Sequence, residues 1–390
     1  MGTQWLARIA LSTVAAAGSW LLAEVAVRVL LPPPQLVSVY AKSNYASRLE
    51  QENRSRLELT APRPQAAGLF VATPTGRRMR ANTHVRIEPN ELSGLDVVVE
   101  TNSLGYRNRE IGPKTRRRVL FLGDSITAAD YLPEECCWVR KVEQLSQSTS
   151  EPLETINAGV GGIGLQNELA ILVETGLGTQ PDVVVLGFYL NDVHESRGVQ
   201  IVQVPRALRW SWVARHVWRA ASLFTLLTGS EVQQGIPRSE WEQWFLAARK
   251  QYHPAKGDPK HEPAAFHQLL LTQFGDWGNA WYDGAWERMQ PNFAELKRLA
   301  VTHQFQLLIV CFPVRPQVDA DYLYDQPQRK LESVCRELAV PMLDLLPKLR
   351  AAAREDAAPL YFDQCHPTVR GSELVAAWVL EFLMAERSAP

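Results

Sequence analysis

The sequence predicts a three-layer α/β/α sandwich with a mainly parallel sheet, a helical insertion and an N-terminal membrane helix. Three short apolar runs, at residues 117–122, 183–190 and 307–312, have the length and composition of strands buried on both faces of a parallel sheet. Helical patterns, with apolar residues at three- and four-residue steps, lie between and after these runs. Strands that alternate with helices in this way define an α/β fold.

The helices and the shorter strands can be placed along the chain. Helices are expected at residues 134–145, 165–177, 293–303, 328–338 and 371–384. A fourth strand is expected at residues 153–156, and β-like pieces such as residues 96–100 precede a turn signal at residues 102–105. We therefore expect a lead-in segment with short strands over residues 33–115 and one α/β domain over residues 116–390.

Residues 196–285 interrupt the alternation of strands and helices, and we interpret them as an insertion. Most of the 12 Trp residues lie there. Within it, residues 209–227 mix Arg, Trp and Leu in an amphipathic pattern that would suit a membrane surface. A helical cap packed on the sheet is the preferred alternative.

Charge and cysteine content narrow the class of protein. Lys and Arg number 41 against 42 Asp and Glu, so the chain offers no long-range attraction to nucleic acid. The five cysteines are an odd number scattered along the chain, and the adjacent Cys136 and Cys137 lack the spacing of a zinc knuckle. No metal and no nucleic-acid partner is expected.

The N-terminus predicts export. Residues 9–31 are almost entirely apolar, and Glu24 and Arg28 lie four residues apart near their end, where they can pair. Three prolines at residues 32–34 then stop the helix. A single-pass anchor over residues 1–32 is favoured over a cleaved signal peptide, because no clean cleavage site precedes the prolines, and over a buried helix. Arg8 on the short tail places the bulk of the chain on the extracytoplasmic side.

Two separate segments carry candidate nucleophilic chemistry. Gly123, Asp124 and Ser125 directly follow the first strand, so Ser125 is expected at the carboxyl edge of the sheet, where open α/β folds bind ligands. Asp363 precedes His366 by three residues in a loop before the last helix. A carboxylate so placed can accept the Nδ1–H of the imidazole and leave Nε2 free as a base. Taken alone, the Gly-Asp-Ser segment fits an ordinary turn with a helix N-cap, and the Asp363 and His366 pair fits a metal-binding or surface pair equally well.

Two further segments offer hydrogen-bond donors at the same edge. Residues 157–162, Asn-Ala-Gly-Val-Gly-Gly, follow the 153–156 strand, and their glycines let backbone N–H groups face a cleft. Asn191 and Asp192 follow the strand at residues 183–190. The Asn191 amide could therefore donate into this cleft, whereas the carboxylates of Asp124 and Asp192 are expected to support their own loops.

These four segments, in this order and at strand ends, resemble the conserved blocks of the SGNH hydrolase (GDSL-like lipase/esterase) superfamily. The resemblance covers about residues 96–195 and 286–385 and implies an SGNH, flavodoxin-like fold. It also implies a serine nucleophile at Ser125 and triad partners at Asp363 and His366. The oxyanion hole would consist of the Ser125 and Gly162 N–H groups and the Asn191 amide. No cofactor is required by such a mechanism.

The expected activity is hydrolysis of an O-acyl, in particular acetyl, ester on an envelope glycan or lipid. Three rivals remain open. An O-acyltransferase acting on cell-surface polysaccharide would use the same triad, and a non-catalytic carbohydrate-binding module could use the same fold. Residues 159–164 also satisfy the glycine pattern of a dinucleotide-binding loop, but the preceding strand is poorly apolar and the expected acidic residue is displaced. The sequence does not specify an oligomeric state.

Overall fold

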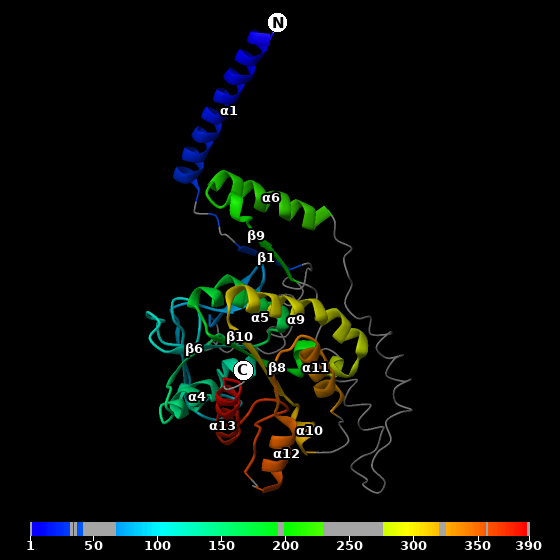
Figure 1. The fold of residues 1–390 in the computed structure, drawn as a ribbon. Coiled ribbons are helices and arrows are strands. Elements are labelled where there is room, and N and C mark those ends of the chain that lie inside the picture. Colours follow the sequence, from blue (N-terminus) through cyan, green and yellow to red (C-terminus); the bar gives the residue numbers. More distant parts are fainter. Residues whose placement is uncertain are drawn as a thin grey trace. The chain divides into compact units, whose positions relative to one another are not determined.

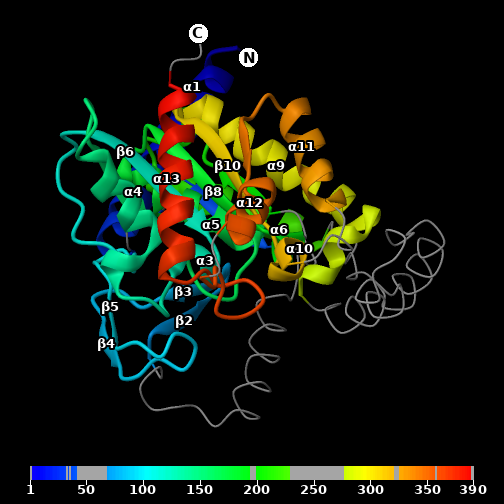
Figure 2. The ribbon, with the colours of Figure 1, turned by 90° about the horizontal axis from the view of Figure 1, so that it is seen from below.

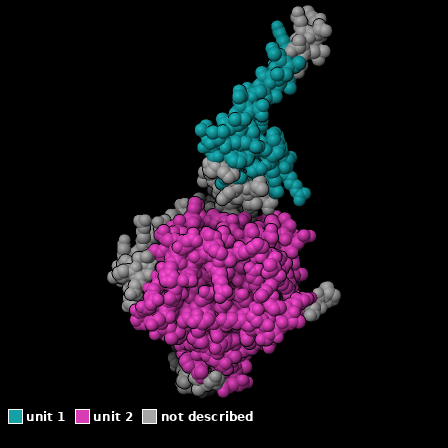
Figure 3. All heavy atoms as spheres, turned by 90° about the vertical axis from the view of Figure 1, so that its left-hand side faces the viewer, with its two compact units in different colours: residues 1–42, 200–232 teal, residues 43–199, 233–390 magenta. Residues whose placement is uncertain are grey.

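The structure is a computed structural model. It describes residues 2–31, 34, 37–41, 68–193, 199–228, 276–319, 325–355 and 358–387. The predicted insertion falls largely outside them, as do Trp241 and Trp244 and most of the lead-in before residue 68. The chain divides into two compact units, one of residues 1–42 and 200–232 and one of residues 43–199 and 233–390 (Figure 3). This division into units does not test the predicted boundaries at residues 32 and 115, which stay a prediction.

The second unit is built on a five-stranded parallel sheet, which confirms the predicted fold class (Figure 1). Its strands lie in the order β11-β10-β8-β6-β7. All three long strands were predicted within one or two residues, and the short edge strand β11 was missed. The bounds are β6 (Arg117–Gly123), β7 (Leu153–Asn157), β8 (Val183–Tyr189), β10 (Gln306–Phe312) and β11 (Met342–Asp344).

The central strands are apolar because both faces of the sheet are covered. Every residue of β8 is buried, and β6 and β10 are buried except at their first residue. Helices α5 and α9 lie on one side of the sheet, and α4 and α13 pack together on the other (Figures 1 and 2). The bounds are α4 (Trp138–Ser146), α5 (Leu165–Glu174), α9 (Asp283–His303), α11 (Gln326–Glu337) and α13 (Val369–Ala385), so all five predicted helices are confirmed.

Shorter helices connect these elements. The single-turn helix α3 directly follows β6, and a 3-10 turn, η3, directly follows β8. Another 3-10 turn, η6, carries Trp277 and Trp281, which are fully buried, so the end of the predicted insertion belongs to the core of the α/β unit. The bounds are α3 (Ser125–Ala128), η1 (Glu134–Cys136), η2 (Gly176–Thr179), η3 (Leu190–Val193), η6 (Trp277–Trp281), α10 (Arg315–Asp319) and α12 (Leu346–Glu355).

The lead-in segment forms two antiparallel hairpins. One pairs β2 (Phe70–Thr73) with β3 (Gly76–Met79), and the other pairs β4 (His84–Ile87) with β5 (Val97–Glu100). The buried Arg107 then joins this segment to the α/β unit, because its guanidinium donates to the carbonyl oxygens of Ala128, Ala129 and Leu132 around the end of α3. The lead-in is therefore fastened to the helix that begins with Ser125.

The first unit contains the N-terminal helix α1 (Gly2–Leu30) and part of the insertion. Ala10–Leu30 is long and apolar enough to cross a membrane, as the sequence predicted, and a signal sequence would have the same properties. The insertion contributes η4 (Arg206–Leu208) and helix α6 (Trp212–Thr228), and α6 contacts α1. A short sheet pairs β1 (Val37–Ala41) with β9 (Val199–Gln203). The prediction that this part of the insertion forms a helical cap on the sheet stays a prediction.

Candidate active site

The turn after β6 holds Ser125 at the first position of α3. Gly123 has a φ of +154°, and a side chain there would collide with Thr127 and with the Gly187 carbonyl oxygen of the neighbouring strand. The Asp124 carboxylate caps α3 by accepting the Ile126 N–H at 2.9 Å. Glycine and aspartate thus each have a local structural reason to precede the serine.

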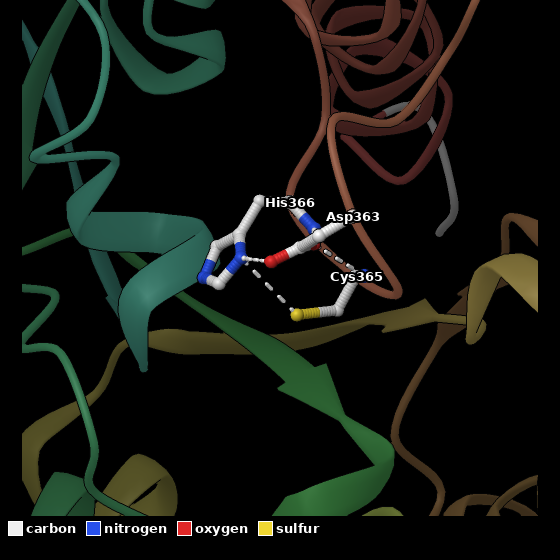
Figure 4. A group of neighbouring side chains, drawn as sticks. All are labelled: Asp363, Cys365 and His366. Carbon is white, nitrogen blue, oxygen red and sulfur yellow. Dashed lines mark hydrogen bonds and ion pairs between the residues drawn. The ribbon is translucent and has the colours of Figure 1, made fainter. Parts of the chain in front are cut away.

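Ser125, His366 and Asp363 form a continuous hydrogen-bonded chain. The Ser125 Oγ lies 2.9 Å from Nε2 of His366, although 241 residues separate the two in sequence. The His366 Nδ1 lies 2.7 Å from Oδ2 of Asp363 (Figure 4). The other oxygen of Asp363 accepts the backbone N–H groups of Cys365 and His366, at 2.9 and 2.8 Å. The carboxylate is therefore fixed before it meets the imidazole, and Nε2 is left facing the serine hydroxyl.

The surroundings of His366 raise its basicity. Burial alone would lower its pKa, but the hydrogen bond to Asp363 and the negative charges of Asp363 and Asp124 outweigh burial and raise it above the ordinary value. Burial would likewise raise the pKa of Asp363, but the bonds from His366 and from the two backbone N–H groups hold it at about 2. The Tyr131 ring packs edge-on against the imidazole with centroids 4.9 Å apart. These contacts fix the plane and the tautomer of the histidine.

The two predicted donor segments follow the strands on either side of β6. Strands β7, β6 and β8 are adjacent and parallel, so their carboxyl ends share one edge of the sheet. The Asn157 side chain links this edge to α3, because its Nδ2 donates to the Thr127 carbonyl oxygen at 2.9 Å. Gly162 has a φ of +72° and is exposed, and Asn191 lies in η3. Within the described residues, the Ser125 and Gly162 N–H groups donate to no protein acceptor.

Three buried carboxylates lie beneath this edge. Asp192 accepts the Tyr189 N–H at 2.9 Å and so ties down the turn that carries Asn191, while its supporting role stays a prediction. Glu168 in α5 is completely buried, and neither of its carboxyl oxygens has a partner within the described chain. Burial raises the pKa of Asp124 to about 6, and it raises the pKa values of Glu168 and Asp192 well above their ordinary values. Burial therefore favours the protonated form of Glu168 over the carboxylate.

A metal would have to compete with this arrangement. Asp363, Cys365 and His366 bring three possible ligand atoms within 4.8 Å of one another (Figure 4). However, the His366 Nδ1 is already hydrogen-bonded to Asp363, and burial raises the pKa of the Cys365 thiol well above its ordinary value. Zinc binding requires the thiolate. The cluster therefore fits a triad loop better than a metal centre.

Sequence reasoning missed the contribution of the β2–β3 hairpin and of Glu168. The Phe70 ring and the Arg77 guanidinium lie against Gly161 and Gly162, next to the nucleophile turn. No local pattern marks either residue, because hairpin residues acquire neighbours only when the segment folds onto the sheet. Glu168 had one available signal, since it stands beside the apolar run at residues 169–173 of a predicted helix, and a glutamate next to such a run is unusual when the helix is buried.

Serine, imidazole and carboxylate in this geometry, at the carboxyl edge of a parallel sheet, are typical of serine hydrolases with an α/β/α fold. Comparison with protein families agrees, since the model of the GDSL-like lipase/acylhydrolase family matches residues 121–374. The chain belongs to this family, as its four sequence blocks predicted. No curated protein matches it.

Several solved structures are similar to the chain at low identity. The acetyl xylan esterase AlAXEase shares 16% identity over 68% of this chain and 99% of its own, with a TM-score of 0.38. A lipolytic G-D-S-L protein from Veillonella parvula shares 14% over 68% and 98%, with a TM-score of 0.37. A catalytic mutant of the acetylxylan esterase Axe2 from Geobacillus stearothermophilus shares 15% over 70% and 95%, also with a TM-score of 0.37.

Proposed function

We propose that the protein hydrolyses O-acyl esters with Ser125 as nucleophile, His366 as its base and Asp363 as the group that orients the base. The observation that carries the proposal is the hydrogen-bonded chain from the Ser125 Oγ through both nitrogens of His366 to Asp363. In the first step the Ser125 Oγ forms a bond to the ester carbonyl carbon, and its proton passes to Nε2 of His366. The depressed pKa of Asp363 keeps its carboxylate charged beside the resulting imidazolium.

The tetrahedral intermediate places negative charge on the former carbonyl oxygen. We propose that the Ser125 and Gly162 N–H groups and the Asn191 amide donate to it. The free N–H groups of Ser125 and Gly162 support this assignment. His366 then returns its proton to the departing alcohol, which leaves an acyl-enzyme on Ser125. Water, deprotonated by His366, attacks the acyl carbon, and His366 returns this proton to the Ser125 Oγ as the bond to the acyl carbon breaks and the acid is released.

The test is turnover of a short-chain activated ester by the full chain. Ser125→Ala should abolish turnover, and Asn191→Ala should lower kcat by about 10²–10³-fold while the protein stays folded. Ser150→Ala is the matched control, because Ser150 is exposed and lies just before the amino end of β7, whereas the triad lies at the carboxyl edge of the sheet, and this variant should retain full activity. Near-normal turnover by the Ser125→Ala variant would refute the proposed function.

We propose O-acylated envelope glycan or lipid, with acetyl as the acyl group, as the substrate class. An acceptor sugar added to the same assay separates this from the alternative of an O-acyltransferase. Product that is free acid, at a rate unaffected by the sugar, supports the hydrolase. Acyl-sugar formed in proportion to acceptor supports the transferase, and binding of the glycan without turnover supports a carbohydrate-binding module.

We further propose that α1 is retained as a single-pass anchor and that the catalytic unit lies on the extracytoplasmic side. The support comes from Glu24, which is 7% exposed and caps α6. Its carboxylate accepts the Ser211 hydroxyl at 2.7 Å and the N–H groups of Trp212 and Val213 at 2.8 and 3.2 Å. Arg28 completes the group by pairing with Glu24 at 2.8 Å. Cleavage that removes α1 would leave the first N–H groups of α6 without their acceptor.

Retention of α1 is tested on the full chain expressed in cells. Mass measurement of the mature protein should show the N-terminal helix in place, and the protein should resist extraction from membranes at alkaline pH. Glu24→Ala should make α6 more susceptible to trypsin, which cleaves after Arg215 and Arg219, whereas Ser19→Ala, an exposed change in the same helix, should not. A mature chain that begins after residue 24 would contradict the anchor.

A further inference from the structure

The β2–β3 hairpin brings one arginine to the peptide that precedes the Gly162 donor. The Arg77 Nη1 donates to the Gly161 carbonyl oxygen at 3.1 Å. The same nitrogen lies 3.0 Å from the point where a Cβ on Gly162 would be, so the absence of a side chain at Gly162 leaves room for the guanidinium. Gly161 itself faces the nucleophile, since a Cβ there would lie 3.8 Å from Cβ of Ser125.

The carbonyl that Arg77 holds and the N–H of Gly162 belong to a single peptide unit. In a trans peptide the C=O and N–H bonds point in opposite directions from one rigid plane. Fixing the Gly161 oxygen therefore fixes the direction of the Gly162 N–H. A charged donor on the oxygen also withdraws electron density from the peptide, and this polarisation makes the N–H a stronger donor.

The guanidinium is itself held in place. It stacks on the Phe70 ring, with its carbon 3.6 Å from the ring centroid. Burial lowers the pKa of Arg77, and the negative charge of Asp130 opposes that effect. Within the described residues, Arg77 makes no ion pair with a carboxylate, and its one hydrogen bond goes to Gly161. A side chain so placed directs its charge at one backbone carbonyl.

We infer that Arg77 is a positioning residue for ester hydrolysis, which orients and polarises the Gly162 N–H through the Gly161 carbonyl. This inference rests on the proposed role of Gly162 as an oxyanion donor. Arg77 does not touch the substrate in this account. Its effect falls on the transition state, where the oxyanion forms, and leaves binding of the ground-state ester nearly unchanged.

Arg78 provides a matched control in the same strand. Because side chains alternate along a strand, Arg77 and Arg78 point to opposite faces of the hairpin. The Arg78 guanidinium pairs with Glu174 at 2.8 Å and donates to the Thr75 hydroxyl at 2.9 Å. Loss of Arg78 therefore removes an equal charge and an ion pair from the hairpin without touching the Gly161–Gly162 peptide.

The experiment compares Arg77→Met, Arg77→Lys and Arg78→Met in the full chain, with kcat, KM and the inhibition constant of a boronic acid that forms a tetrahedral adduct on the serine. Arg77→Met should lower kcat about 10- to 100-fold, less than outright loss of a donor, with KM changed less than about threefold. The boronic acid should bind more weakly by a similar factor. Arg77→Lys should recover part of the loss, because the ammonium can reach the carbonyl but cannot stack as guanidinium does. Arg78→Met should leave kcat within about threefold of the parent.

Besides an unchanged kcat in Arg77→Met, two outcomes would overturn the inference. One is an equal effect of the Arg77→Met and Arg78→Met substitutions on kcat, which would make Arg77 a structural residue of the hairpin. The other is a loss by Arg77→Met that appears in KM alone, which would place Arg77 in substrate binding. Asn191→Ala, measured alongside, keeps the proposed function separate. If Asn191→Ala is impaired but Arg77→Met is not, only the inference is rejected, whereas near-normal turnover by the Ser125→Ala variant rejects the function itself.

Discussion

The substitution Asp363→Asn tests the orientation of the base with almost no change in shape. The side-chain oxygen of the introduced amide could still accept the N–H groups of Cys365 and His366, which Oδ1 of Asp363 accepts at 2.9 and 2.8 Å. Oδ2, 2.7 Å from Nδ1 of His366, would become an NH₂ group. Two donors cannot face each other, so the imidazole would hold its proton on Nε2, toward Ser125, and could not accept the serine proton.

The size of the effect follows from this tautomer change and from the lost charge. The corresponding substitution in the trypsin triad costs about 10⁴-fold in kcat. The Asp363 side chain is 37% exposed, so solvent screens part of the attraction between its charge and the imidazolium. We therefore expect kcat to fall by about 10³–10⁴-fold. The assay is kcat for the activated ester, with the thermal unfolding midpoint as a check on folding. A loss below about tenfold in a folded variant would refute the role of Asp363 as the orienting group.

Three further results are expected. The acid limb of kcat/KM should have its midpoint above the ordinary histidine pKa, because His366 must be neutral and its pKa is raised; a midpoint below that value would contradict the assignment. Glu168→Gln should reduce the fall of the thermal unfolding midpoint as the pH rises above the ordinary pKa of glutamate, because burial raises the pKa of Glu168. Because burial raises the pKa of Glu168, unfolding above the ordinary glutamate pKa releases a proton, so rising pH destabilises the unsubstituted protein; parallel curves for the two proteins would contradict a raised pKa. Gly159→Ala should destabilise the fold by about 1–3 kcal/mol and lower activity, because a Cβ would meet the backbone at Ala128, whereas Gly178→Ala, in open space, should do neither in the same thermal scan.

The parts of the fold that follow from local pattern could be predicted from the sequence. Strands β6, β8 and β10 are buried on both faces and therefore read as continuous apolar runs. Helices α4 and α13 pack through one face each, which gives the three- and four-residue periodicity. The edge strand β11 has only three half-buried residues and carries too little pattern to be recognised.

The candidate site was predictable where its residues stand in short motifs. Ser125, Asn191 and His366 each follow a strand or precede a helix in a recognisable local context. Arg77 could not be found in this way, because its position beside Gly161 depends on how a hairpin more than 80 residues earlier packs against the sheet. The same holds for Glu24, whose partner Ser211 lies 187 residues later in the chain. Long-range contacts of this kind leave no periodic signal in the sequence.

The pairing of Glu24 with the start of α6 also sets an order of events during biosynthesis. A ribosome that has just delivered α1 has not yet made residue 211, so the Glu24 carboxylate has only Arg28 as a partner at that stage. The first unit is therefore completed only after residues 43–199 of the second unit, which include β6, β7 and β8, have been synthesised. Nascent chains stopped before residue 211 should hold α1 without its partner helix, and those stopped well beyond residue 228 should hold both.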